Sequence, residues 1–121
     1  MKLRLLLLIL AAKLKRAARH NRPFREFVRN KKARVLIRTA GGGEGRLFVF
    51  DEGKVSSSRG ADGAADVAMV WADAETGYRV MSCGDEEASI AALTERKLVI
   101  EGDYKQFMWF SAAVAKMAAP A

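Results

Sequence analysis

The segment Leu93–Met117 constrains the fold more than any other part of the chain. Lys97–Glu101 has the composition of a short strand, and Gly102 turns the chain. Asp103 then predicts a helix start, with Gln106 placed to complete a capping box. The helix carries four consecutive large apolar residues, Phe107, Met108, Trp109 and Phe110. Such a run points around most of a helix, so we expect this helix to be covered on several sides.

Composition excludes most chemistry. With 121 residues, half of them hydrophobic, the chain is long enough for one domain with a substantial core. The single cysteine, Cys83, cannot form an internal disulfide, fits a reducing compartment and is expected to be a small buried residue. The single histidine, His20, is expected at the surface, which leaves no zinc site and no Ser–His–Asp triad. We therefore expect a cytoplasmic protein with no catalytic residue, metal or cofactor.

The net charge of +7 is unevenly distributed. Residues 1–38 hold thirteen Lys or Arg against one acid, whereas the remaining residues hold eight against thirteen. This basic arm is typical of contact with anionic lipid, nucleic acid or an acidic partner, and equally of a solvated surface. Nucleic acid is the weaker alternative, because Phe24 and Phe27, the aromatic residues among these basic residues, suit a core.

An N-terminal helix is predicted over residues 3–20. Its apolar run is too short to span a bilayer, and basic residues follow where a signal peptide would be cleaved. The helix either docks its leucines on the domain or lies at a membrane surface or partner. We divide the chain into a basic helical segment, 1–30, and a second domain, 31–119. The residues expected at the membrane or partner are Leu7, Leu10, Leu14, Lys13, Arg16 and, on the lysine side of the last helix, Trp109.

The pattern predicts an α+β fold: a five-stranded, mostly antiparallel sheet covered by helices. A helical turn is expected over 24–30, strands over 33–39, 46–51, 54–59, 65–71 and 97–101, and helices over 74–82, 86–95 and 104–117. The strands are apolar on both faces, which is unusual for an antiparallel sheet. Something must therefore cover each face: helices on one, and on the other the N-terminal helix, a second subunit in a homodimer, or a bound apolar molecule.

Residues 33–117 resemble the sterol carrier protein type-two family of lipid-binding domains. The resemblance depends on three segments in the family's order: the hairpin Arg46–Val55, the strand Ala65–Trp71 leading into a helix near Asp73, and the passage Leu93–Asp103. The leucine-rich, basic first helix departs from the family pattern. The resemblance implies a sterol-carrier-protein-like fold with an apolar tunnel between sheet and helices, and no enzymatic activity.

In such a tunnel the expected ligand is a fatty acyl chain, phospholipid, sterol or isoprenoid. Alternatively, the family's non-catalytic members in bacterial membrane-lipid and quinone pathways suggest an accessory protein that docks peripherally on a membrane or partner through its basic helix. The candidate pocket residues are large and apolar: Leu36, Phe48, Phe50, Met69, Trp71, Tyr78, Met81, Leu93, Phe107, Phe110 and Val114.

Overall fold

The computed structural model describes residues 2–118. In chain order the elements are α1 (Lys2–His20), α2 (Arg22–Val28), β1 (Lys32–Thr39), β2 (Gly45–Asp51), β3 (Lys54–Arg59), β4 (Val67–Trp71), α3 (Ala74–Cys83), α4 (Glu86–Thr94), β5 (Leu98–Gly102) and α5 (Tyr104–Ala118). The predicted elements are all present. The expected end of the second domain, residue 119, lies outside the described residues.

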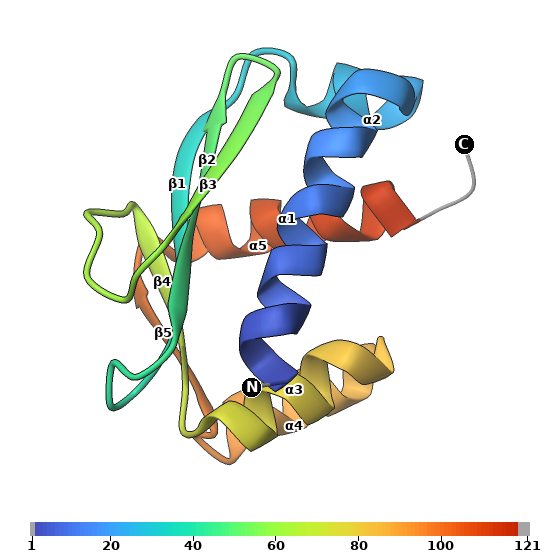
Figure 1. Ribbon diagram of the computed structural model, residues 1–121. Helices are drawn as coiled ribbons and strands as arrows, with labels where there is room; N and C mark the ends of the chain where they lie inside the picture. Colours follow the sequence, from blue (N-terminus) through green and yellow to red (C-terminus); the bar gives the residue numbers. More distant parts are fainter. Residues whose placement is uncertain (1, 119–121) are drawn as a thin grey trace.

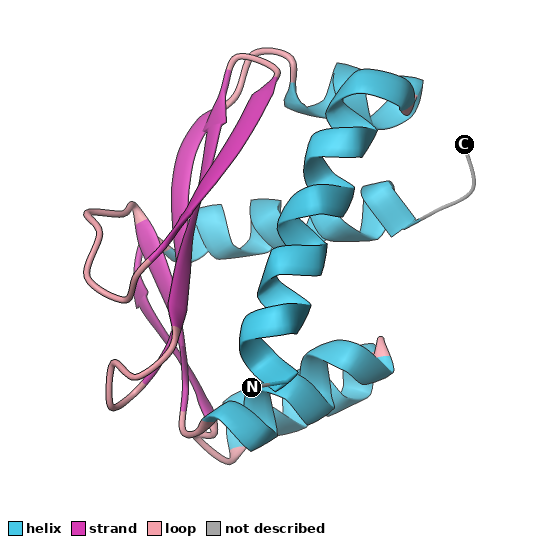
Figure 2. Ribbon diagram, in the orientation of Figure 1, coloured by secondary structure: helices cyan, strands magenta, loops and turns pink. Residues whose placement is uncertain are grey.

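The strands form one sheet in the order β3-β2-β1-β4-β5. β1 runs parallel to β4, and the other neighbouring strands are antiparallel, so the predicted mostly antiparallel α+β sheet is confirmed. The helices gather on one face of the sheet (Figures 1 and 2). α5 contacts β1, β4 and β5, whereas α1 crosses α5 and contacts β2 and β3.

The inner face of the sheet, toward the helices, carries the hydrophobic core. Strand side chains alternate between faces, so every second residue of the central strands points inward. The cross-strand partners Val35 and Phe48, and Ile37 and Met69, share this face. Together with Phe50, Val67 and Trp71 they are buried in one hydrophobic cluster.

α1 contributes a buried stripe to the same cluster. Its buried residues follow the i, i+4, i+7 spacing of one helix face: Leu3, Leu7, Ala11, Leu14 and Ala17. The alternative in which the N-terminal helix docks its leucines on the domain is therefore correct for this stripe. The boundary proposed at residue 30 does not separate two cores, because residues on both sides of it belong to one cluster.

The outer face of the sheet is covered by a loop, not by a helix. Leu36 and Leu47 pair across β1 and β2 on this face, and both are buried. The connection 60–66 passes over them, since a Cβ added to Gly63 would lie 3.2 Å from a Leu47 methyl carbon. Arg34 holds the connection by donating to one of its carbonyls at 2.9 Å. This loop therefore covers part of the second apolar face, for which the sequence did not identify a cover.

Aspartate side chains begin three of the helices. The Asp73 carboxylate accepts a hydrogen bond from the Thr76 N–H at 2.7 Å. In the same way Asp85 accepts from the Glu87 N–H, and Asp103 from the Lys105 N–H, each at 3.0 Å. The hydrogen bonds from Thr76 hold the pKa of Asp73 below its usual value. The cap at Asp103 is as predicted, but Gln106 Oε1 is buried without a partner, so the reciprocal half of the capping box is not made.

An ion pair ties α1 to the turn between β1 and β2. The Arg4 guanidinium reaches the Glu44 carboxylate at 3.0 and 3.3 Å, and the Glu44 side chain is only 7% exposed. We expect Arg4→Met to lower the free energy of unfolding by about 1–2 kcal/mol, because a buried carboxylate loses its partner while the half-exposed arginine limits the effect. Urea denaturation measures this change.

The matched control is Arg16→Met, which removes an exposed arginine of the same helix. It should change the free energy of unfolding by less than about 0.5 kcal/mol. Equal effects of the two substitutions would show that the Arg4–Glu44 pair does not anchor α1.

Candidate functional site

The space between the sheet and the helices is lined by aromatic side chains. Phe48 and Phe50 point inward from β2, and Phe110 meets them from α5 at ring-centroid distances of 5.7 and 6.0 Å. Offset and edge-to-face contacts at such distances are favourable for aromatic pairs. The arrangement makes a soft, apolar wall with few polar groups, which is the kind of surface that accommodates an apolar chain.

α1 occupies the centre of this space. Its residues Leu3, Leu7 and Leu14 are at most 1% exposed, and they lie in the same cluster as the aromatic wall. The interior described here is thus filled by the protein's own side chains. An apolar ligand at this position would have to replace part of the leucine stripe.

Nearly all of the predicted pocket residues meet in this cluster. Those that are buried or partly buried there are Phe48, Phe50, Met69, Trp71, Tyr78, Met81, Leu93, Phe107, Phe110 and Val114. Leu36 is the exception and was placed wrongly, because the β1 register turns it to the outer face. It lines a second, shallow hollow of about 410 Å³ beneath the connection 60–66.

Trp109 is covered from within the domain. Its ring stacks on Phe27 of α2 at 5.7 Å and meets the edge of Phe50 at 4.9 Å, and Lys31 Nζ lies 5.0 Å from the ring centroid. These side chains leave Trp109 partly buried against the hydrophobic cluster that includes the α1 leucines. Its contact with a membrane or partner stays a prediction. Phe24 of the basic arm is fully buried, and Phe27 is partly buried, with Trp109 stacked on its ring and Lys116 Nζ 5.7 Å from its ring centroid.

Two buried polar atoms within residues 2–118 lack a hydrogen-bond partner: Trp71 Nε1 and Gln106 Oε1. Trp71 is 1% exposed, and its ring lies so close to α3 that a Cβ on Gly77 would come within 3.0 Å of it. A buried hydrogen-bond donor without a partner lowers the free energy of unfolding by about 1–3 kcal/mol. The Trp71 indole is the donor that an oxygen atom of a ligand could satisfy in this otherwise apolar space.

The apolar residues exposed on α1 are not the leucines that were predicted to contact a membrane or partner. Leu7 and Leu14 are buried and Leu10 is half-buried, so the buried leucines are not available to a membrane. Instead Leu5, Leu8 and Ile9 are 57%, 50% and 42% exposed. The helical spacing of these residues could have indicated this second face, but the continuous leucine run concealed which stripe turns inward.

Basic residues continue the exposed face of α1 toward its carboxyl end. Lys13 and Arg16 are exposed as predicted, and Arg19 lies one turn further on. The exposed large apolar residues thus lie in the amino half of α1, where Lys2 and Arg4 are exposed as well, and exposed cations follow in its carboxyl half. This face is named the α1 surface below.

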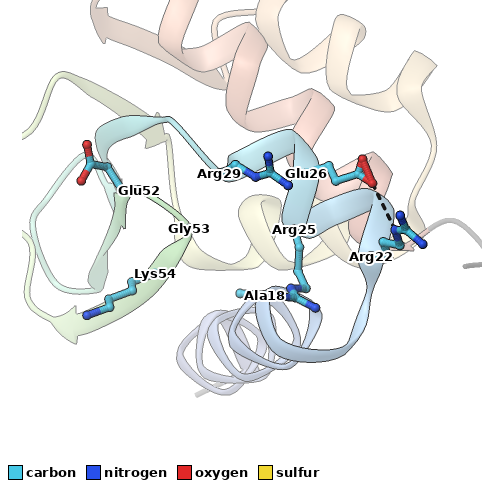
Figure 3. Close-up of a pocket in the computed structure, with 8 residues that line it drawn as sticks. All are labelled: Ala18, Arg22, Arg25, Glu26, Arg29, Glu52, Gly53 and Lys54. Carbon is cyan, nitrogen blue, oxygen red and sulfur yellow. Dashed lines mark hydrogen bonds and ion pairs between the residues drawn. The ribbon is translucent and has the colours of Figure 1, made fainter.

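A basic hollow of about 650 Å³ lies where α1 ends. Figure 3 shows its lining from the last turns of α1, from α2 and from the turn between β2 and β3: Ala18, Arg22, Arg25, Glu26, Arg29, Glu52, Gly53 and Lys54. Sequence reasoning identified the basic arm but not this hollow, because the β2–β3 turn that closes it is distant in the chain.

Other chemistry-bearing residues lie apart from these sites. Cys83 is exposed rather than buried, at the end of α3, where its Sγ donates to the Val80 carbonyl at 3.1 Å. His20 is exposed, as expected. Residues 2–118 contain no cluster of three or more potential metal ligands. None of the described helices has the length and apolar character needed to cross a bilayer.

Neither a family model nor a curated protein matches the sequence. Solved structures do match. The ubiquinone synthesis protein UbiJ-SCP2 is 19% identical, with a TM-score of 0.65 over 93% of this chain and 88% of that one. Sterol carrier protein 2 is 18% identical, with a TM-score of 0.56 over 91% and 88%. Palmitated SCP2L2 from Aedes aegypti is 17% identical, with a TM-score of 0.54 over 87% and 90%. The chain therefore has the sterol carrier protein type-two fold.

Proposed function

We propose that this protein binds one apolar chain, such as a fatty acyl or isoprenoid group, between the sheet and the helices, without catalysing a reaction. The observation that carries the proposal is the aromatic wall of Phe48, Phe50 and Phe110 facing a helix that contributes only small and aliphatic side chains. The palmitated mosquito protein of the same fold supports it.

The energetics set a minimum length for the ligand. Re-exposing three buried leucines of α1 costs about 5–9 kcal/mol, at about 1.5–3 kcal/mol each. Each CH₂ group that the ligand buries returns about 0.8 kcal/mol. Roughly six to eleven buried CH₂ groups therefore offset the leucines, and only longer chains gain net affinity.

We therefore expect a steep dependence of binding on chain length. Hexadecanoate should displace a fluorescent fatty acid from the purified protein, whereas hexanoate should not, because its chain is too short to offset the leucine stripe. Displacement titrations measure this, and native mass spectrometry reports any lipid that purifies with the protein. Lipid-free protein that also fails to bind any acyl probe would remove the proposal.

The unpartnered indole of Trp71 predicts that the ligand carries an oxygen acceptor. Trp71→Phe should weaken hexadecanoate binding about tenfold, since a hydrogen bond to a charged group contributes about 1.5–3 kcal/mol. Binding of diphenylhexatriene, a hydrocarbon dye without an acceptor, should change much less. Equal weakening of both probes would mean that Trp71 acts through packing alone.

A second proposed role is docking on an anionic membrane through the α1 surface. The observation that favours it is the exposure of Leu5, Leu8 and Ile9 beside a basic half-face. Burying three half-exposed aliphatic side chains contributes about 3 kcal/mol, and basic residues near an anionic leaflet add about 1 kcal/mol each. Such a sum supports reversible, peripheral binding. An accessory role in a membrane-lipid or quinone pathway fits this mode, and the ubiquinone synthesis protein of the same fold supports it.

Vesicle co-sedimentation tests the docking role. Replacing Leu5, Leu8 and Ile9 together with glutamine should reduce binding to anionic vesicles at least tenfold, because the apolar contribution is lost while the basic residues remain. The control replaces Ile90 and Val99, which are 55% and 41% exposed on other elements, and should leave binding unchanged. Unchanged partitioning of the triple variant would contradict docking through this surface.

A further inference from the structure

The basic hollow at the end of α1 has firmly placed walls. Asn21 caps α2 by accepting from the Phe24 N–H at 3.2 Å. The β2–β3 turn is held against the connection that follows α2, because the Glu52 N–H donates to the Lys31 carbonyl at 2.9 Å. Gly53 in that turn has a φ of +93°, and a Cβ there would lie 3.9 Å from the Arg29 Cα. These contacts fix the backbone on both sides of the hollow.

Four basic residues line the hollow against two carboxylates, Glu26 and Glu52, so its charges are unbalanced. Arg22 pairs with Glu26 at 3.4 Å, but Arg25 and Arg29 make no ion pair within the described residues. Arg25 lies in α2 and Arg29 is the C-cap residue of that helix, four positions further on, and Figure 3 shows the Arg25 side chain extending beside Ala18. Like charges at this spacing destabilise a helix, so the fold keeps them together at a cost that an anion would relieve.

We propose that this hollow binds a phosphate group, with Arg25 and Arg29 as its main ligands. Guanidinium groups present donors in a planar fork that matches phosphate oxygens, and two unpaired arginines satisfy a doubly charged phosphate better than a carboxylate. Lys54 also lines the hollow, but Figure 3 shows its side chain directed away from Arg25 and Arg29, so it is not counted as a ligand. The phosphate is either that of a soluble phosphomonoester or the headgroup of an anionic lipid.

This site is independent of the interior ligand. Its charged residues lie outside the hydrophobic cluster, and the exposed leucines of the α1 surface lie toward the opposite end of that helix. Loss of acyl binding therefore does not affect the proposal, and loss of phosphate binding does not affect the proposed acyl site.

The test uses the full chain with two matched variants. One replaces Arg25 and Arg29 with glutamine. The other replaces Arg59 and Arg79, two exposed arginines outside the hollow, and so removes the same charge. Glycerol 3-phosphate is titrated at constant ionic strength while the amide resonance of Gly53 is followed by NMR. In parallel, vesicles of phosphatidylcholine with phosphatidic acid are tested by co-sedimentation.

We expect R25Q/R29Q to weaken binding at least tenfold in one of the two arms, and R59Q/R79Q to weaken it less than twofold. If R25Q/R29Q weakens binding of glycerol 3-phosphate, a free phosphomonoester is a sufficient ligand. If it weakens only binding to the vesicles, the ligand is a lipid headgroup. Equal weakening by both variants would overturn the proposal, because the effect would then be general electrostatics. Absence of wild-type binding in both arms would also overturn it.

Discussion

The rest of the structure depends on the burial of the α1 leucine stripe against the inner face of the sheet. Leu3, Leu7 and Leu14 supply the apolar cover that β2 and β3 need, because α5 lies over β1, β4 and β5. Without α1, the inner face of β2 and β3 would lose this cover. The Arg4–Glu44 ion pair orients the helix on the sheet, because it fixes the amino end of α1.

The proposed docking role would give this single helix a second task, on the side opposite its buried stripe. The leucine run at its start places apolar side chains on every side, so burying one stripe leaves Leu5, Leu8 and Ile9 exposed. A helix that only completed a core would carry polar residues there. These exposed residues are the ones that the proposed membrane docking would use.

The sequence predicted the elements and most of the core because these depend on local patterns. The alternation of apolar and polar residues, the aspartate caps and the glycine turns each involve residues that are close in sequence to the element they predict. Leu36 was misplaced because facing depends on register: in strand 33–39 it could belong to either face until its pairing with Leu47 was known. The cover over Trp109 comes from Phe27, and the basic hollow needs the β2–β3 turn. Both are long-range contacts that no local pattern encodes.

The proposed apolar site and the proposed docking role meet in α1. A ligand that enters between sheet and helices replaces leucines that α1 now buries, and those leucines then need another apolar environment. A membrane surface in contact with the exposed face of α1 provides that environment, so the cost of opening the interior is lower at a membrane than in water. By linkage, a bound apolar chain should favour the membrane-bound state to the same extent. Loading and release would then occur at the bilayer, where the ligand itself is most soluble.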